Sequence, residues 1–212
     1  MKNNFIVAIT GASGSGKTYL INRLRETLGE EHLCLMSQDN YYHEIALQPK
    51  DENNIENFDL PESIDMPTYL QDIRKVCEGQ EVKRKEYAFN NVDKPAHWLH
   101  FKPAPILLLE GLFLFQDPDI QQLTDLKIFM DTSETTRLKR RIIRDNQERG
   151  YDLNDVLYRY EKHAHPSYEQ FIAPYKKDAD MIIPNHHHPD KAIEILATFL
   201  QTKIYQMISL HK

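Results

Sequence analysis

The sequence predicts an α/β fold, namely a doubly wound and mostly parallel sheet with a small antiparallel β insertion. Short strand-like and longer helix-like segments alternate along the 212 residues. The strand-like segments are apolar runs, which is typical of strands buried on both faces of a parallel sheet. With 41% hydrophobic and 27% charged residues, the chain has the composition of a folded globular protein. We expect residues 1–212 to form a single domain, because no Gly-, Ser- or Pro-rich linker divides them.

The first strand and the first helix are the clearest elements. Residues 5–10 (FIVAIT) form an apolar, β-branched run that stops at Gly11, so we expect a central strand there. Residues 17–28 are predicted to form a helix, because apolar side chains recur at helical spacing and Gly29 provides a C-terminal stop. These apolar positions are Leu20, Ile21, Leu24 and Leu28.

The alternation continues along the rest of the chain. Further strands are predicted at residues 32–37, 106–109, 126–130 and 181–183, and further helices at 65–78, 134–149, 152–175 and 189–207. The helix at 65–78 has Asp65 as its N-cap, Pro67 in its first turn and Gly79 at its end. Segment 81–101 shows partial period-two patterning around a polar turn, which predicts a β-hairpin-like insertion on the substrate side.

Charge and cysteine content exclude several classes of partner. The formal net charge is −6, so the protein has no overall basic field that would bind nucleic acid or an anionic membrane. Cys34 and Cys77 lie far apart in the sequence without metal-ligand spacing, which indicates reduced thiols. The apolar runs are too short for a signal peptide or a membrane span. We therefore expect a cytoplasmic protein with no nucleic-acid or membrane partner.

The strongest motif joins the first strand to the first helix. Residues 11–18 match the phosphate-binding pattern GxxxxGK[ST] at every fixed position. In such a P-loop the glycines let successive backbone N–H groups point at phosphate oxygens. The alternative, a glycine-rich turn without a ligand, requires a chance match of both the motif and its flanking elements. The expected nucleotide-binding residues are Gly11, Ala12, Ser13, Gly14, Ser15, Gly16, Lys17 and Thr18.

Three further side chains are expected at the phosphates. Lys17 should reach the β- and γ-phosphates, and the Thr18 hydroxyl is placed to coordinate Mg²⁺. Glu110 follows an apolar strand and is the candidate metal-side acid, with a helix cap or a surface carboxylate as its alternative.

Asp39 is the candidate catalytic base. It follows the strand at 32–37, at the edge where parallel sheets bind ligands, so it can accept the proton of an attacking hydroxyl. A solvated carboxylate that caps the next turn is the alternative for this residue. Together with Thr18 and Glu110, Asp39 completes the candidate metal set.

A basic segment predicts a lid over the phosphates. Residues 137–149 contain six basic and two acidic side chains in a chain of negative net charge. At helical spacing Arg137, Arg141 and Arg144 share one face, next to a further basic residue at 140. Such a face can close over triphosphate oxygens, so we expect a lid region at 137–151. A plain solvated face is the alternative.

Missing motifs narrow the class of nucleotide-binding protein. The chain has no Asn-Lys-x-Asp string for reading guanine, and no Asp-x-x-Gly follows the strand before Glu110. Both absences argue against a guanine-specific switch. A mechanical ATPase would need room for a partner-binding domain, and this chain leaves little. A small-molecule kinase remains the favoured class.

Six segments, taken together and in order, make the sequence resemble one known family. The segments GASGSGKT, QDNYY, NFDLPESID, Tyr87-Ala88-Phe89, LLLEGLFLF and DTSETTRLKRRIIRDNQERG occur in the order found in the uridine/cytidine kinase family, over about residues 5–185. The resemblance implies a P-loop kinase that uses ATP or GTP with Mg²⁺. It also implies phosphorylation of the ribose 5′-hydroxyl of uridine or cytidine, and a homo-oligomer, commonly a tetramer.

The resemblance also implies roles for individual residues. Asp39 becomes the catalytic base and Asp59 the binder of the ribose diol, because two carboxylate oxygens can take both vicinal hydroxyls. Lys17 acts at the phosphates. The remaining implied residues are Tyr42, Tyr87, Phe89 and Arg141 on the nucleoside, and Arg144 and Arg149 on the phosphates.

Three positions depart from the pattern of the family. Val92 replaces a histidine, Tyr151 replaces an arginine and Arg159 replaces a glutamine. Since all three lie on the base side or substrate side, the identity of the base stays open. A kinase for another hydroxyl-bearing metabolite, resembling phosphoribulokinase or pantothenate kinase, is the alternative. A nucleotide-binding regulator without catalysis is a second one.

Overall fold

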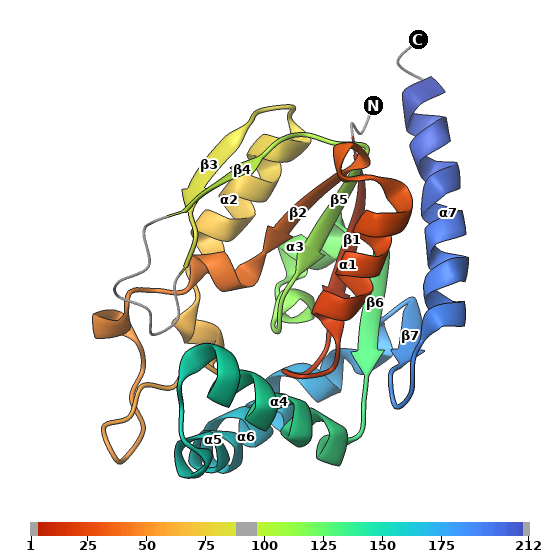
Figure 1. Ribbon diagram of the computed structural model, residues 1–212. Helices are drawn as coiled ribbons and strands as arrows, with labels where there is room; N and C mark the ends of the chain where they lie inside the picture. Colours follow the sequence, from red (N-terminus) through yellow and green to blue (C-terminus); the bar gives the residue numbers. More distant parts are fainter. Residues whose placement is uncertain (1–3, 88–96, 210–212) are drawn as a thin grey trace.

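A five-stranded parallel sheet forms the centre of the protein in this computed structural model, which describes residues 4–87 and 97–209 (Figure 1). The strand order is β2-β5-β1-β6-β7, and each pairing within the sheet is parallel. The strands are β1 (Phe5–Thr10), β2 (Leu33–Ser37), β5 (Ile106–Glu110), β6 (Leu126–Asp131) and β7 (Met181–Pro184). The predicted central position of the first strand is confirmed.

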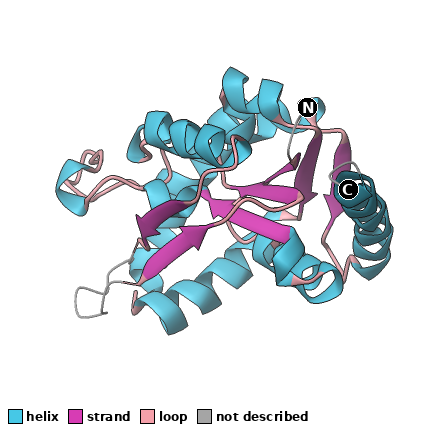
Figure 2. Cartoon of the chain, turned by 90° about the horizontal axis from the view of Figure 1, so that it is seen from above, coloured by secondary structure: helices cyan, strands magenta, loops and turns pink. Residues whose placement is uncertain are grey.

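Helices cover both faces of the sheet, so the predicted doubly wound fold is confirmed (Figure 2). One face packs against α1 (Lys17–Leu28) and α7 (Asp190–Ser209), which supply the buried residues Leu20, Leu24, Leu196 and Leu200. The other face packs against α2 (Met66–Cys77), with Tyr69 and Ile73 fully buried, and against α3 (Pro118–Leu123). Both faces of β1 are therefore buried, which explains its unbroken apolar sequence.

The carboxyl ends of the parallel strands lie at one edge of the sheet. Helices α4 (Glu134–Arg149), α5 (Leu153–Arg159) and α6 (His165–Ser167) lie across this edge (Figure 1). The predicted P-loop follows β1 and Asp39 follows β2 at this edge, and Glu110 is the last residue of β5 there. This edge is where open α/β sheets bind ligands.

The predicted antiparallel insertion is present. Strands β3 (Val82–Lys85) and β4 (Trp98–Phe101) pair in antiparallel register, with Val82 opposite Phe101. The tip of this hairpin lies outside the described residues, and with it the predicted base-side positions Phe89 and Val92.

Two predictions of helices need correction. The segment expected as one helix at 152–175 is helical from residue 153 to residue 172, but two π-helical segments, Tyr160–Ala164 and Tyr168–Ile172, interrupt its α-helical hydrogen-bond pattern on either side of α6. Pro166 lies between them, and a proline has no N–H group for the helical hydrogen bond. The short helix α3 was not predicted from the sequence, although Asp117 caps it by accepting a hydrogen bond from the Ile120 backbone N–H at 3.0 Å. Six residues are too few to show a periodic apolar pattern.

Two further sequence predictions concern thiols and membranes. Cys34 and Cys77 are free cysteines. Burial, and to a lesser extent the nearby Cys77, raises the pKa of the Cys34 thiol to about 12. Among the described helices, none is both long enough and apolar enough to cross a bilayer.

Candidate active site

The P-loop connects β1 to α1 and is braced from two later strands. Gly16 ends the loop in a left-handed conformation (φ 97°) at the N-cap of α1. The Ser15 carbonyl accepts hydrogen bonds from the Asn185 side-chain amide at 2.8 Å and from the Thr132 hydroxyl at 3.1 Å. Since Thr132 follows β6 and Asn185 follows β7, the loop is held in its bent form before any phosphate binds.

Two glycines are required by close packing on the loop. A Cβ atom at Gly14 would lie 2.8 Å from the Arg137 carbonyl oxygen, and one at Gly16 would overlap the Asn185 side-chain amide. Both positions also have positive φ angles, which side chains other than glycine rarely adopt. Helix α4 therefore packs directly on the P-loop.

Lys17 and Glu110 form a buried pair at the loop. The Lys17 ammonium donates hydrogen bonds to the Gly11 and Ala12 carbonyls at 3.1 and 3.4 Å, and it lies 3.6 Å from Glu110 Oε1. The Ser37 hydroxyl donates to Glu110 Oε2 at 2.6 Å. Burial raises the pKa of Glu110 above its ordinary value, although the Lys17 charge opposes that rise. Glu110 is thus neither a helix cap nor a surface carboxylate.

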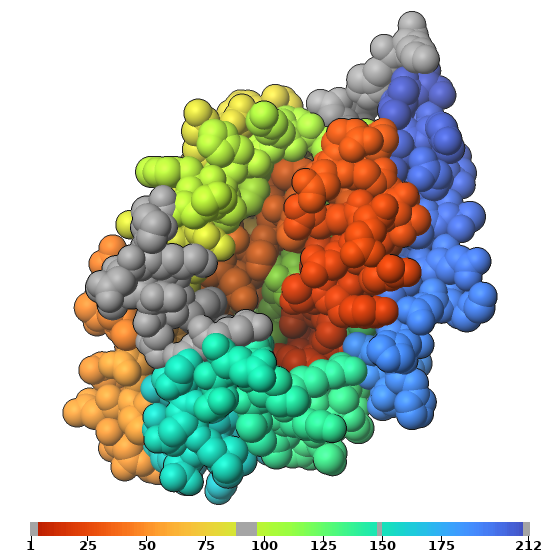
Figure 3. All heavy atoms as spheres, viewed as in Figure 1, coloured from red at the N-terminus to blue at the C-terminus, as the bar shows by residue number. Residues whose placement is uncertain are grey.

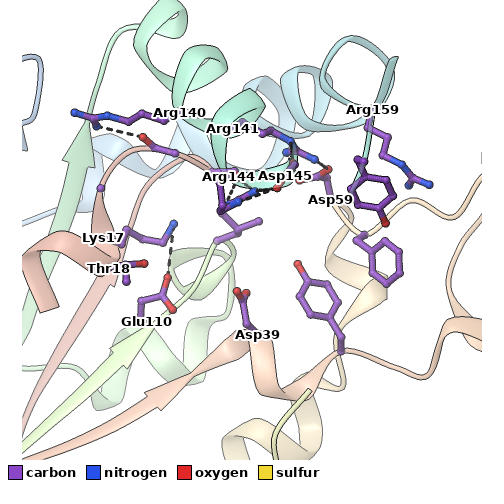
Figure 4. Close-up of a pocket in the computed structure, with 17 residues that line it drawn as sticks. Lys17, Thr18, Asp39, Asp59, Glu110, Arg140, Arg141, Arg144, Asp145 and Arg159 are labelled. Carbon is purple, nitrogen blue, oxygen red and sulfur yellow. Dashed lines mark hydrogen bonds and ion pairs between the residues drawn. The ribbon is translucent and has the colours of Figure 1, made fainter. Parts of the chain in front are cut away.

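Asp39 is the second residue of a short helical turn, Gln38–Tyr41, directly after β2, and its backbone N–H donates to the Ser37 hydroxyl at 3.3 Å. Its carboxylate faces the same space as Lys17, Thr18 and Glu110 (Figure 4). That space is a cavity of about 270 Å³. In the space-filling view the surface is hollowed beside α1, above α4 (Figure 3).

The cavity gathers side chains from distant parts of the sequence. Its described lining consists of Ser13, Gly14, Gly16, Lys17, Thr18, Asp39, Tyr42, Phe58, Asp59, Glu110, Leu112, Arg140, Arg141, Arg144, Asp145, Tyr151 and Arg159. Most of the predicted site residues are in this set. The volume and the concave shape suit a small-molecule ligand.

Asp59 and Arg141 form a bidentate ion pair at one wall of the cavity. Arg141 Nη1 and Nη2 donate to the two Asp59 carboxylate oxygens at 3.2 and 3.0 Å, and both residues are buried. Burial opposes ionisation of Asp59, but the charge and hydrogen bonds of Arg141, together with the nearby His163 and Arg144, outweigh it in sum, so the pKa of this carboxyl lies below its ordinary value. The carboxylate predicted to bind a ribose diol therefore already has a partner. It retains further lone pairs for accepting hydroxyl hydrogens.

The other basic residues of α4 divide between the P-loop and the protein interior. Arg144 donates to the Ser13 hydroxyl at 3.4 Å and to Asp145 at 2.8 Å, and Arg140 donates to the Gly14 carbonyl at 3.3 Å. Arg137, one turn before Arg141 on the same helix, lines a small adjoining pocket with Ala12, Ser13 and Asp59. Its guanidinium stacks on the Tyr168 ring at 3.9 Å and is absent from the lining of the cavity.

The opposite end of the cavity is aromatic. The Tyr42 ring lies 5.7 Å from the Phe58 ring and 5.5 Å from the Tyr87 ring. Arg159 lies over the Tyr151 ring at 5.1 Å and donates to the Glu56 carbonyl at 2.7 Å. The two departures from the family pattern that the structure describes, at 151 and 159, thus contact each other.

The sequence did not predict two residues that line the cavity, Asp145 and Phe58, and the position of one predicted residue, Arg149, is not tested. Asp145 was noted only as an acid in a basic segment, yet it lies 3.2 Å from Arg141 Nε as well as bonding Arg144. The spacing of four from Arg141 is a helical ion-pair signal that could have identified it. Phe58 had no signal other than its place before Asp59. The side chain of Arg149 is outside the described part of the structure.

The metal prediction rests on few protein ligands. In the described part of the chain, no three His, Cys, Asp or Glu side chains are grouped so that they could bind a metal. Asp39 and Glu110 supply two carboxylates and Thr18 a hydroxyl. This donor set fits Mg²⁺, which usually takes one or two carboxylates together with substrate phosphates and water.

The fold and the cavity define the class of the protein. A P-loop between the first strand and helix of a parallel sheet, with acidic residues facing it across a small-molecule cavity, is the arrangement of a P-loop phosphotransferase. Residues 6–193 match the sequence pattern of the "Phosphoribulokinase / Uridine kinase family". The chain belongs to this family, so the resemblance predicted from the sequence is confirmed.

Known relatives agree with this assignment. The chain is 36% identical over 199 residues to a uridine kinase of Borrelia duttonii, covering 94% of this chain and 95% of the relative. It is 34% identical over 202 residues to a uridine kinase of Lactobacillus helveticus, covering 95% and 96%. The solved phosphoribulokinase of Rhodobacter spheroides matches with a TM-score of 0.60 at 19% identity, over 87% of this chain and 71% of that one. This last likeness supports the fold.

Proposed function

We propose that the protein transfers the γ-phosphoryl group of ATP or GTP to the 5′-hydroxyl of a ribonucleoside, namely uridine or cytidine. The observation that carries this proposal is that Asp39 and the P-loop face one another across a single cavity. An acceptor hydroxyl held by Asp39 would lie beside the terminal phosphate of a nucleotide held by the loop. The uridine kinases among the relatives favour the pyrimidine acceptor.

The phosphate half of the reaction is assigned to the P-loop and α4. Backbone N–H groups of residues 11–18 would hold the phosphates, with the positive end of α1 behind them. Lys17 would exchange its carbonyl partners for phosphate oxygens, which are stronger acceptors. Arg144, which now contacts Ser13 in the loop, would stabilise the charge of the transferred group, together with Arg149.

Mg²⁺ is the expected metal. Thr18, Glu110 and Asp39 would hold it, directly or through water, and it would neutralise charge on the β- and γ-phosphates. Burial, with a smaller contribution from the Asp39 charge, raises the pKa of Glu110, so the folded protein resists a negative charge on Glu110. A divalent cation would remove that resistance.

The acceptor half is assigned to Asp39, Asp59 and the aromatic end. Asp39 would accept the proton of the 5′-hydroxyl and keep that oxygen in line with the phosphorus atom. Asp59 would receive the ribose hydroxyls while Arg141 holds its carboxylate in place. The pyrimidine ring would lie among Tyr42, Phe58 and Tyr87, with Phe89 as a further predicted contact.

The test is ADP release with a panel of acceptors. We expect turnover with uridine or cytidine and much less with their 2′-deoxy forms, because only the ribose offers a diol to Asp59. Phosphopentoses and pantothenate belong in the same panel, and turnover with one of them alone would favour the alternative kinases. Tight ATP binding without turnover of any acceptor would instead indicate a nucleotide-binding regulator and refute the proposal.

Two properties of the intact protein complete the proposal. We propose a cytoplasmic location, supported by the free cysteines. We also propose a homo-oligomer, commonly a tetramer in the family. Apolar side chains exposed on α7, Ile195 and Phe199, support this proposal, since such groups are often buried between subunits. Light scattering of the purified protein measures the oligomeric state directly.

A further inference from the structure

A small hairpin carries the ribose-binding residue toward the cavity. We call residues 49–59 the strap. The strap is closed by its own backbone, because Asn57 N–H donates to the Pro49 carbonyl at 2.7 Å and Asp51 N–H donates to the Ile55 carbonyl at 2.9 Å. The Asn57 side chain then accepts from the Asp59 backbone N–H at 3.0 Å. A displacement of the strap would therefore move Asp59 with it.

A cluster of three polar side chains ties the strap to the helices after α4. We call Asp51, Tyr158 and His163 the latch. Asp51 Oδ2 accepts from the Tyr158 hydroxyl at 2.6 Å and lies 2.8 Å from His163 Nε2. For this second contact to be a hydrogen bond, His163 must carry its proton on Nε2. The Tyr158 and His163 rings meet edge to face at 5.8 Å, and His163 is only 2% exposed.

The latch carboxylate has partners on all sides. Asp51 Oδ1 accepts from the backbone N–H groups of Asn53 and Ile55 at 2.8 and 2.9 Å. The Asn53 side chain in turn donates to the Tyr158 hydroxyl at 2.7 Å. The hydrogen bond from Tyr158 lowers the pKa of Asp51 below its ordinary value even though desolvation opposes the shift. The group is therefore a charged carboxylate that both shapes the strap and binds the helices.

The latch lies outside the cavity. Among the described residues that line the cavity, none belongs to the latch. The strap nevertheless touches the helices at two further places that do line it, through Arg159 to the Glu56 carbonyl and through Arg141 to Asp59. Arg144, one turn further along α4 than Arg141, contacts the P-loop. A continuous set of contacts thus runs from the phosphate-binding loop to the strap.

From this arrangement we propose that Asp51, Tyr158 and His163 are positioning residues that couple the two substrate sites. Phosphates drawn to Arg144 would fix α4 and, through the latch, the strap that presents Asp59. A bound nucleotide would then order the strap in advance and so reduce the entropy that the nucleoside loses on binding. The same coupling would make a bound nucleoside tighten the binding of the nucleotide. The inference rests on the proposed function for the identity of the acceptor, but the contacts are independent of it.

The main test compares uridine affinity with and without AMP-PNP, a non-hydrolysable analogue of ATP. In the unmodified protein we expect the analogue to tighten uridine binding about tenfold, within the usual range for coupled sites. Tyr158→Phe, which removes only the hydroxyl from a partly exposed ring, should reduce this factor to less than twofold. The affinity for the analogue alone should stay within twofold, because the P-loop is unchanged. Calorimetry measures the three affinities in each of the two proteins.

A pair of variants separates positioning from simple stabilisation. His163→Gln keeps an N–H donor near the Nε2 position, whereas His163→Leu removes it. Both should lower the melting temperature, but only His163→Leu should abolish the coupling. Lys162→Gln is the matched control, since it breaks the exposed Lys162–Glu52 ion pair at 3.8 Å on the same turn and the same strap. It should leave the coupling unchanged.

Hydrogen exchange provides a readout that needs no nucleoside. AMP-PNP should slow amide exchange in residues 50–57 of the unmodified protein and fail to do so in Tyr158→Phe. If no ribonucleoside is phosphorylated but this protection is seen, the proposed function fails and the latch stands. If Tyr158→Phe keeps both the protection and the tenfold coupling, or if the unmodified protein shows neither, the latch proposal is overturned.

Discussion

The two ends of the cavity are built in different ways. The phosphate end is one continuous stretch, residues 11–18, held by its own glycine conformations and by two braces from β6 and β7. The acceptor end is assembled from parts far apart in the sequence, and its central ion pair joins Asp59 to Arg141, 82 positions away. The first end depends on local backbone geometry. The second depends on long-range pairing of charges.

The buried carboxyl groups at the two ends differ in the same way. Burial raises the pKa of Glu110 at the phosphate end, where Lys17 only partly compensates. At the acceptor end burial also opposes ionisation of Asp59, but the charge and hydrogen bonds of Arg141 with the charges around it outweigh burial together and hold the pKa of Asp59 below its ordinary value. The carboxyl group at the phosphate end is therefore only partly compensated by its cationic partner, whereas the carboxyl group at the acceptor end is fully paired. Three variants and one pH series test this contrast.

The largest effect is expected for Asp39→Asn. Loss of a general base lowers rates by about 10² to 10⁴, and we expect kcat to fall by about 10³. The affinity for ATP should stay within threefold, because the P-loop is continuous and does not rely on Asp39. Steady-state ADP release and calorimetric ATP binding measure the two quantities. Asp119→Asn, which changes an exposed carboxylate on α3, is the control and should match the unmodified enzyme. An equal loss of ATP binding in Asp39→Asn would show that Asp39 is structural.

Asp59→Asn should act on the acceptor alone. Hydrogen bonds to a charged group contribute about 1.5 to 3 kcal/mol, so the KM for uridine should rise by about 10- to 100-fold. The KM for ATP should change little. The variant should also lose most of its discrimination against 2′-deoxyuridine, since the diol contact is removed. Arg141→Ala alone and with Asp59→Asn completes a double-mutant cycle. Additive effects in that cycle would mean that the ion pair does not position the carboxylate.

Gly16→Ala should act on the nucleotide alone. A side chain in the left-handed region costs about 1 to 2 kcal/mol, and at Gly16 it would also displace the Asn185 brace, so ATP binding should weaken about tenfold. Gly79→Ala is the matched control, because Gly79 has a similar φ of 85° and nothing within 4 Å of its would-be Cβ. The control should lose stability without losing ATP affinity. Equal ATP affinities in the two variants would show that the brace is unimportant.

The smallest effect is a difference in pH dependence between the two carboxyls. Because the pKa of Glu110 is raised, protonation of Glu110 should begin first as the pH falls, and the KM for Mg²⁺ should then rise several-fold. The pKa of Asp59 is lowered, so its contribution to stability is present above about pH 4 and is lost only as the pH falls further. Mg²⁺ titrations and denaturant unfolding between pH 7 and 3 measure the two effects. If the stability of Asp59→Asn falls less steeply at acid pH than that of the unmodified protein, the loss of stability is due to Asp59. If the KM for Mg²⁺ and the stability change together in a single pH step, the two carboxyl groups do not differ as proposed.

The sequence predicted the fold well because its signals are local. Helix α1 was predicted at its observed bounds, from apolar spacing and a terminal glycine. The buried strands stood out as short apolar runs, and their bounds differ from the prediction by at most about one residue. The helix at 152–175 was predicted without its two π-helical segments, which lie on either side of Pro166, a residue with no backbone N–H to donate.

The candidate site was predicted in part. The P-loop, Asp39 and Glu110 follow directly from motif and strand position, and the structure places all of them at one cavity. The direction of Arg137 could not be predicted, because a helical face shows which side chains are neighbours but not which of them meets the interior. Its stacking on Tyr168 depends on how the later π-helical segment packs.

By itself the sequence determined the central sheet, the phosphate-binding loop and the class of reaction, because apolar periodicity, glycine conformations and a contiguous motif act over a few residues. Only the tertiary structure decided that Asp59 is paired with Arg141, that Arg159 binds the strap, and that Asp51 reaches His163. These contacts join residues about 80 to 110 positions apart. Their energy comes from the burial and matching of charges in space, which no local pattern in the chain records.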